Sequence, residues 1–127
     1  MIIGIGCDIV EHSITEQLKW ESDFDLLRRI FSQKELELYQ INKTIKFLAG
    51  RFAVKEAVLK CLGTGMQDGI SLIDISVTQK QTSKPELILT NEVKKISDEL
   101  GINLWHISIT HSTTSSLAVV IAEQFGG

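Results

Sequence analysis

Residues 47–65 read FLAGRFAVKEAVLKCLGTG, and this stretch decides the fold. It belongs to a helix predicted from about Lys43 to Leu62, with Gly63 placed to end that helix in the left-handed conformation. Apolar residues recur there at helical spacing and form one stripe, made of Ile45, Leu48, Ala49, Phe52 and Leu59. A stripe of this kind has to be buried, so we expect this helix to lie at the centre of the molecule.

Glu56 falls inside the apolar stripe, and Lys60 follows it four residues later. One interpretation is an ordinary Glu/Lys pair at the edge of the stripe, worth about 0.2–0.5 kcal/mol. The other is an inward carboxylate, which needs a cation as partner because an unpaired buried charge costs several kcal/mol. The sequence leaves both interpretations open.

The rest of the chain changes its period from helical to alternating after this helix. Before it we predict an apolar strand over Met1–Cys7, a helix over residues 22–31, and another that starts at the capping box Ser32–Glu35. After it we predict strands over Ser71–Val77, Glu86–Thr90, Leu104–Thr110 and Leu117–Ala122, a hairpin loop over Gln79–Pro85, and a helix over Asn91–Leu100. The pattern indicates an α+β fold, with a long central helix packed on a small, mostly antiparallel sheet.

Composition narrows the class of protein. The 127 residues contain no repeat or linker, so we expect residues 1–127 to form a single domain. A net charge of -3 argues against a general nucleic-acid binder, and no apolar run is long enough for a membrane span. The apolar N-terminus has no basic leader, and Cys7 and Cys61 make no disulfide framework. A cytoplasmic protein with reduced thiols is the simplest expectation.

Asp8 directly follows the predicted first strand and has two interpretations. It is either a cap or turn residue, or a ligand at the edge of a sheet. Together with Glu56 it offers two hard oxygen ligands, which suit Mg²⁺ with its other positions filled by water and phosphate. The three histidines and two cysteines match no zinc spacing.

Other residues are candidates for holding an anion. The turn Gly63-Thr64-Gly65 either exposes backbone N–H groups to a phosphate or is an ordinary helix exit. Arg51, Lys55 and Lys60 on the long helix either receive phosphate oxygens or are simply solvated. His106 and His111 suit hydrogen-bond donation to an anion better than metal binding.

Three segments resemble a known family: GIGCDIVE (4–11), FLAGRFAVKEAVLKCLGTG (47–65) and WHISITHS (105–112). In order and spacing they are similar to holo-acyl-carrier-protein synthase, the short single-domain branch of the 4′-phosphopantetheinyl transferases. The resemblance spans nearly the whole chain and implies that family's fold. It also implies a reaction: transfer of phosphopantetheine from coenzyme A to a serine hydroxyl of an apo acyl carrier protein, with release of adenosine 3′,5′-bisphosphate.

The resemblance implies a role for each matching residue. Asp8 and Glu56 would hold Mg²⁺, Glu56 would accept the serine proton, and Lys60 would stabilise charge on the leaving phosphate. The positions implied to line the coenzyme A site are Arg51, Lys60, Gly63, Thr64, Gly65, Lys84, Pro85, Ser108 and His111. The family's usual Gly-Lys-Pro turn reads Ser83-Lys84-Pro85 in this chain.

The resemblance also implies partners. Family members are commonly homotrimers with active sites between subunits, so Asp8 and the second half of the chain are expected to meet Glu56 of a neighbouring chain. Segment 11–21 usually carries arginines that grip the acidic carrier, but here it holds three glutamates and one lysine. Arg28 and Arg29 would then take over the docking, or the carrier is a less acidic, specialised one.

Two other classes of function compete with the transferase. One is a carrier- or nucleotide-binding protein without turnover, and the other is an oligomeric structural domain in which Glu56 merely pairs with Lys60. The sequence does not name the physiological carrier, and it does not say whether acylated coenzyme A is used.

Overall fold

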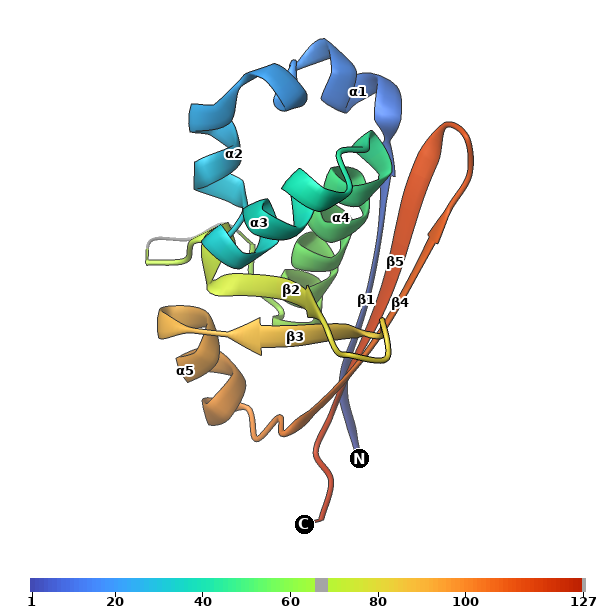
Figure 1. Cartoon of the computed structure of the whole chain (residues 1–127). Helices are drawn as coiled ribbons and strands as arrows, with labels where there is room; N and C mark the ends of the chain where they lie inside the picture. Colours follow the sequence, from blue (N-terminus) through green and yellow to red (C-terminus); the bar gives the residue numbers. More distant parts are fainter. Residues whose placement is uncertain (66–68, 127) are drawn as a thin grey trace.

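A long helix and a three-stranded antiparallel sheet form the centre of the computed structural model, which describes residues 1–65 and 69–126. The helix is α4 (Ile45–Leu62), and the sheet has the order β1 (Ile2–Glu11), β5 (Ser115–Glu123), β4 (Leu104–His111). One face of the sheet covers α4, chiefly through β1 and β5 (Figure 1). The small buried residues of β5 lie on this face, at Ser116, Ala118, Val120 and Ala122.

Three shorter helices cover the side of α4 that faces away from the sheet (Figure 1). They are α1 (His12–Gln17), α2 (Phe24–Ile30) and α3 (Gln33–Ile41), with a 3₁₀ turn over Trp20–Ser22. The predicted capping box is confirmed: Ser32 accepts from the Glu35 N–H, and the Glu35 carboxylate accepts from the Ser32 N–H. The predicted terminator is also confirmed, because Gly63 has φ of 72°.

A hairpin of two strands, β2 (Ile75–Gln79) and β3 (Pro85–Leu89), forms a second antiparallel sheet beside α3 and α4. Helix α5 (Asn91–Glu99) follows β3 and ends before Gly101, whose φ is 79°. The α+β class and the antiparallel pairing are as predicted, although the strands divide into two sheets.

Apart from shifts of one or two residues at element ends, the structure differs from the predicted elements in three places. The first strand continues past Cys7 to Glu11, because its pairing with β5 runs on to Ser115, so Asp8 lies within the strand rather than at its end. Helix α1 falls in a segment for which no element was predicted. Residues 72–74 form a 3₁₀ turn instead of strand, which leaves Ile73 exposed, while Ile75 and Val77 are buried as expected.

Two glycines bring β1 directly onto α4. A Cβ on Gly6 would lie 1.9 Å from the Ala57 carbonyl oxygen, and one on Gly4 would lie 2.4 Å from that of Cys61. No side chain fits at either position, so the strand backbone rests on the helix backbone. The register that this contact sets places the Asp8 region of β1 beside the middle of α4.

Lys55 is the fully buried charged residue of α4, whereas Glu56, for which the sequence left an inward and an edge position open, is half-buried. Lys55 and Glu35 are both 0% exposed, and the Lys55 Nζ lies 2.6 Å from Oε1 of Glu35. The same Nζ donates to the carbonyls of Leu72 and Ile75. Because both the sheet and α3 cover α4, its buried surface is wider than one stripe. Lys55 is therefore a core residue and not a phosphate contact.

We predict that Lys55→Met lowers the free energy of unfolding by about 3–5 kcal/mol, because it leaves the Glu35 carboxylate buried without its cation. Burial lowers the pKa of Lys55 while Glu35 opposes that shift, as expected for a pair held inside the core. Urea unfolding followed by circular dichroism measures the change.

The matched control for this prediction is Lys94→Met, which breaks the exposed pair between Lys94 and Asp98 on α5. That variant should lose no more than about 0.5 kcal/mol, because exposed ion pairs contribute little. Equal losses in the two variants would contradict the importance given to the buried pair.

Candidate functional site

The first group of candidate residues gathers where β1 crosses α4. The Lys60 Nζ donates to the Cys7 carbonyl at 2.8 Å and lies 3.3 Å from Oδ1 of Asp8. Glu56 projects from the same flank of α4, one turn before Lys60, and is half-buried. The same chain thus brings Asp8 to the flank of α4 that carries Glu56, whereas the sequence led us to expect that a neighbouring chain would do so.

The charges of Asp8 and Lys60 both act on Glu56. Burial raises the pKa of Glu56, the nearby Asp8 carboxylate raises it further, and Lys60 acts in the opposite direction. Lys60 forms its ion pair with Asp8, so the interpretation of Glu56 as a simple partner of Lys60 is not supported. A cation bound here would relieve the repulsion between the Asp8 and Glu56 carboxylates.

Among the described residues, the donor set at this point consists of the two carboxylates of Asp8 and Glu56. No cluster of three or more His, Cys, Asp or Glu side chains suited to a metal occurs within residues 1–65 and 69–126. Asp8 and Glu56 therefore fit a cation such as Mg²⁺, which keeps several waters and takes further oxygens from a bound phosphate. They do not form a closed site for a structural metal.

The turn Gly63-Thr64-Gly65 follows directly at the end of α4. Its first two N–H groups close the helix, because Gly63 donates to Lys60 and Thr64 donates to the Leu59 carbonyl. These two N–H groups are therefore already used within the helix and do not point to a phosphate, as the interpretation of a phosphate-binding turn would require. Among the described residues, nothing lies within 4 Å of a Cβ placed on Gly63 or Gly65.

A second group lines a cavity of about 600 Å³ between the start of α4, the β2–β3 hairpin and β4. Of the predicted coenzyme A positions, it contains Arg51, Pro85, Ser108 and His111; Lys84 is next in the chain to Pro85. The Arg51 Nε donates to the Val77 carbonyl at 3.0 Å, and the Arg51 guanidinium stacks on the Phe47 ring at 3.7 Å. This anchoring fixes the position of Arg51 at the cavity wall.

The environment of His111 suits an anion. Burial is the largest cause that lowers the pKa of His111, and the nearby Lys46, His12 and Arg51 lower it further. A phosphate placed among these groups would reverse that effect. Lys46 lines the cavity and was missed, because a single exposed lysine at a helix start gives no pattern that marks it.

The two groups lie on opposite flanks of α4. At 100° per residue, Arg51 and Glu56 are separated by about 140° around the helix, and Phe47 and Glu56 by about 180°. Asp8 is on edge strand β1 of the sheet, whereas Ser108 and His111 are on the other edge strand, β4, with β5 between them. One chain therefore does not bring all the predicted site residues to one place.

A separate apolar groove of about 570 Å³ lies between α2, α3 and the turn before β2. Its lining includes Phe24, Arg28, Phe31, Leu36 and Ile73, and none of the predicted catalytic residues. Arg28 and Arg29 are exposed on α2, with the Arg28 guanidinium 4.6 Å from the centre of the Phe24 ring. Within the described residues, no helix is long and apolar enough to cross a membrane.

The comparison with known proteins agrees with this geometry. A family model described as the 4′-phosphopantetheinyl transferase superfamily matches residues 4–120. A holo-[acyl-carrier-protein] synthase of Treponema denticola is 45% identical over 126 residues, covering 97% of this chain and 99% of that protein.

Two solved structures extend the likeness to the fold. The Neisseria meningitidis holo-[acyl-carrier-protein] synthase has a TM-score of 0.87 at 32% identity and covers 97% of this chain and 99% of its own. A Bacillus anthracis holo-(acyl-carrier-protein) synthase in complex with CoA (3′,5′-ADP) has a TM-score of 0.79 at 33% identity, with 98% of both chains covered. The family predicted from the three sequence segments is confirmed.

We predict that Glu56→Gln raises the melting temperature of the free protein at neutral pH. The pKa of this carboxyl group is higher in the folded than in the unfolded state, so folding favours its protonated form. As pH rises from the unfolded-state pKa to the folded-state pKa, ionisation of the group therefore lowers the free energy of unfolding. The gain over wild type should therefore shrink and vanish as pH falls below about 4.5, the ordinary pKa of the group. Thermal unfolding across pH measures it.

The control is Glu37→Gln, at an exposed carboxylate on α3 that should show no such pH-dependent gain. A destabilised Glu56→Gln variant at neutral pH would contradict the crowding of Glu56 by Asp8.

Proposed function

This chain belongs to the 4′-phosphopantetheinyl transferase superfamily, and on that premise we propose how its residues perform the reaction. The enzyme transfers 4′-phosphopantetheine from coenzyme A to a serine hydroxyl of an apo acyl carrier protein and releases adenosine 3′,5′-bisphosphate. The observation that carries the assignment of residues is the meeting of Asp8, Glu56 and Lys60 where β1 crosses α4. The serine oxygen forms a bond to the pantetheine-bearing phosphorus, and the bond from that phosphorus to the bisphosphate breaks.

Asp8 and Glu56 are proposed to hold Mg²⁺, since two adjacent carboxylates are hard ligands whose mutual repulsion a divalent cation relieves. When bound, the metal neutralises charge on the pyrophosphate oxygens of coenzyme A. Glu56 is also the proposed base, and it would accept the serine proton directly or through a water molecule. Lys60 stabilises the charge that develops on the leaving phosphate.

The second group of residues is proposed to complete the coenzyme A site from a neighbouring chain. This group lies on the flank of α4 that is turned away from Glu56, and it comprises Arg51, Lys84, Pro85, Ser108 and His111. Its separation from Glu56 supports a site shared between two copies of the chain. The turn Gly63-Thr64-Gly65 would contribute beside Lys60.

The outer face of the three-stranded sheet supports assembly of a homotrimer. Alternation and register place a row of apolar side chains on the face that α4 does not cover. Ile5 and Ile9 are 63% and 55% exposed, and opposite them on β5 lie Ile121 and Leu117. An apolar face of this kind favours burial against other copies of the chain.

The carrier is proposed to dock on α2. Carrier proteins of this class are acidic near the modified serine, while segment 11–21 here presents three glutamates and one lysine. Arg28 and Arg29 are the exposed basic pair of α2, and Arg28 also lines the apolar groove. We propose the cytoplasm as the compartment, where Cys7 and Cys61 remain thiols.

The direct test is incubation of the protein with coenzyme A, Mg²⁺ and a panel of apo carrier proteins. Transfer adds the mass of phosphopantetheine to the carrier and releases adenosine 3′,5′-bisphosphate in equal amount. Coenzyme A binding without either product would favour the competing class, a binding protein without turnover. Absence of binding to coenzyme A in calorimetry would favour the structural class.

We predict that two inactive variants restore activity when their subunits are mixed. Glu56→Gln removes the proposed base on one flank of α4, and His111→Ala removes a phosphate contact on the other. If each site combines the two flanks from different chains, random mixing at equal ratio regenerates about a quarter of the wild-type sites. The transfer rate after unfolding and joint refolding measures this.

The control is each variant refolded alone, which should stay inactive. A mixture that is no more active than the sum of the separate variants would contradict the shared site while leaving the reaction itself untouched.

We predict that Arg28→Glu/Arg29→Glu slows productive encounter with an acidic carrier by about tenfold or more, because surface charges steer association. The variant should also lose much of the wild-type dependence on salt. Transfer kinetics under carrier-limiting conditions at several salt concentrations measure both effects. The affinity for coenzyme A should not change, because neither arginine lies in the phosphate site.

The matched control is Lys94→Glu/Lys95→Glu on α5, an exposed basic pair away from α2. Equal slowing by the two double variants would mean that net charge, and not α2, governs docking.

A further inference from the structure

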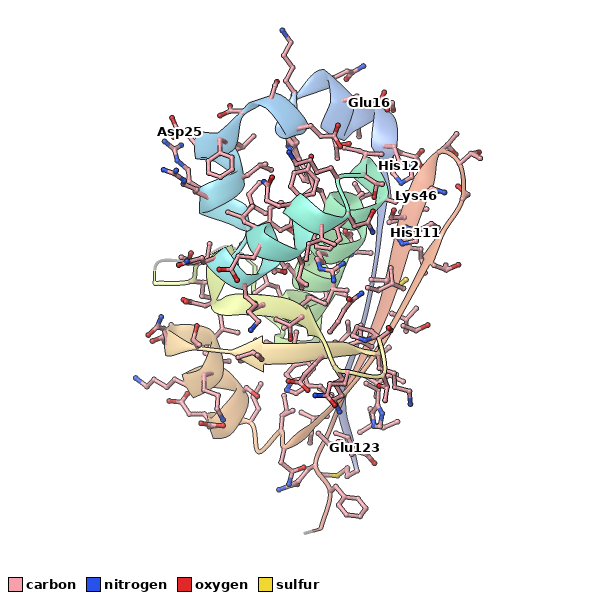
Figure 2. All side chains as sticks on the ribbon, in the orientation of Figure 1. His12, Glu16, Asp25, Lys46, His111 and Glu123 are labelled. Carbon is pink, nitrogen blue, oxygen red and sulfur yellow. The ribbon has the colours of Figure 1, made fainter. Side chains whose placement is uncertain are left out.

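Two histidines share one buried serine at the edge of the proposed phosphate site. The Ser116 Oγ lies 2.8 Å from Nε2 of His12 and 2.7 Å from Nδ1 of His111. Ser116 is 0% exposed and His12 is 4% exposed, although His12 is no part of the cavity that holds His111. Figure 2 shows His12, Lys46 and His111 close together near the start of α4.

His12 is held firmly in this position. Its backbone N–H donates to the Thr114 carbonyl at 2.8 Å, and its own carbonyl accepts from the Thr15 hydroxyl at 2.7 Å. Its Nδ1 lies 3.3 Å from the carbonyl oxygen of Thr113. A buried imidazole with partners on both ring nitrogens has a defined tautomer.

The partners determine where the protons lie. A carbonyl only accepts, so the bond to Thr113 requires a proton on Nδ1 of His12, and neutral His12 then accepts at Nε2. The Ser116 hydroxyl has one proton and donates it to His12, so it must accept from Nδ1 of His111. Neutral His111 therefore carries its proton on Nδ1 and a bare lone pair on Nε2.

The Cε1–Nε2 edge of His111 lies against α4 at Gly50, and the His111 side chain lines the cavity. A Cβ on Gly50 would lie 2.8 Å from Cε1 of His111 and 3.6 Å from its Nε2, so the glycine makes room for this ring. The titratable and charged groups that face His111 are Lys46 and Arg51 of α4 and His12 at the β1–α1 junction. A phosphate oxygen here needs a donor, which a bare lone pair does not supply.

We infer that His12 is a positioning residue for His111: acting through Ser116, it fixes the His111 ring and decides which ring nitrogen carries the proton. Protonated His12 donates to Ser116 from Nε2, and the Ser116 proton then turns to Nδ1 of His111. His111 in that state carries its proton on Nε2 and donates into the cavity without a change in its own charge. Proton uptake in the His12–Ser116–His111 network and phosphate binding therefore favour each other.

The expected effect on phosphate binding rests on the proposed coenzyme A site, but the role of His12 in placing the His111 proton does not. The first test of that role needs no ligand. In ¹⁵N-labelled free protein, two-bond ¹H–¹⁵N spectra above the imidazole titration range should show His111 protonated on Nδ1. His12→Phe keeps the ring volume but frees the Ser116 proton for Nδ1 of His111, so the His111 proton should move to Nε2.

Ser116→Ala breaks the same connection from the other side and gives a second variant in case His12→Phe does not fold. His106→Gln is the control, because His106 bonds to Glu123 at the far end of β4 and should leave His111 unchanged. An unchanged His111 tautomer in both His12→Phe and Ser116→Ala overturns the inference, even in an active enzyme.

The second test is the pH dependence of coenzyme A binding to the intact protein, measured by calorimetry. Wild type should bind about tenfold more weakly above the imidazole range than below it, because the neutral network removes one donor to a charged phosphate. His12→Phe should show a clearly shallower dependence, since its neutral His111 keeps a proton on Nε2. Equal slopes in wild type and variant overturn the role of His12 at the phosphate site, whereas failure of the transfer assay alone would not affect either readout.

Discussion

The buried ion pair between Lys55 and Glu35 is the constraint on which the rest of the structure depends. It joins α3, α4 and β2, because Glu35 also accepts from the Val77 N–H and Lys55 donates to the backbone before β2. Both charges are buried away from water, so turning α4 about its axis would leave an unpaired charge in the core, at a cost of several kcal/mol. Successive helical residues are about 100° apart, and fixing Lys55 toward α3 therefore turns Glu56 toward β1. The proposed catalytic carboxylate is positioned by the neighbour that precedes it in the chain.

The contact of β1 with α4 supplies the other half of this positioning. Gly4 and Gly6 allow the two backbones to touch, and the strand then carries Asp8 to Glu56 and Lys60. The same helix presents Arg51 on its opposite flank, where the β2–β3 hairpin and β4 line the cavity that contains His111. One rigid helix thus serves two part-sites, which ties the proposed activity to assembly of several copies.

The electrostatic character of the two flanks differs, and the difference suits their proposed roles. Glu56 is held beside another carboxylate and has a raised pKa, a cost that a cation would remove. His111 lies among positive charges and has a lowered pKa, a cost that a phosphate would remove. Each flank would therefore be stabilised by a ligand of opposite charge, and on the His111 side the His12–Ser116 connection would couple that binding to a proton.

The sequence by itself determined the long helix, its end at Gly63, the capping box at Ser32 and the alternating strands, because these patterns depend on local spacing. Resemblance carried by three short segments was enough for the family. Only the tertiary structure decided that Lys55 is buried and Glu56 half-buried, since a helical stripe cannot show how many sides of α4 are covered. It also brought Asp8 to Glu56 and His12 to Ser116, which are 104 residues apart. Contacts at that separation follow from sheet register and backbone packing, and no local pattern encodes them.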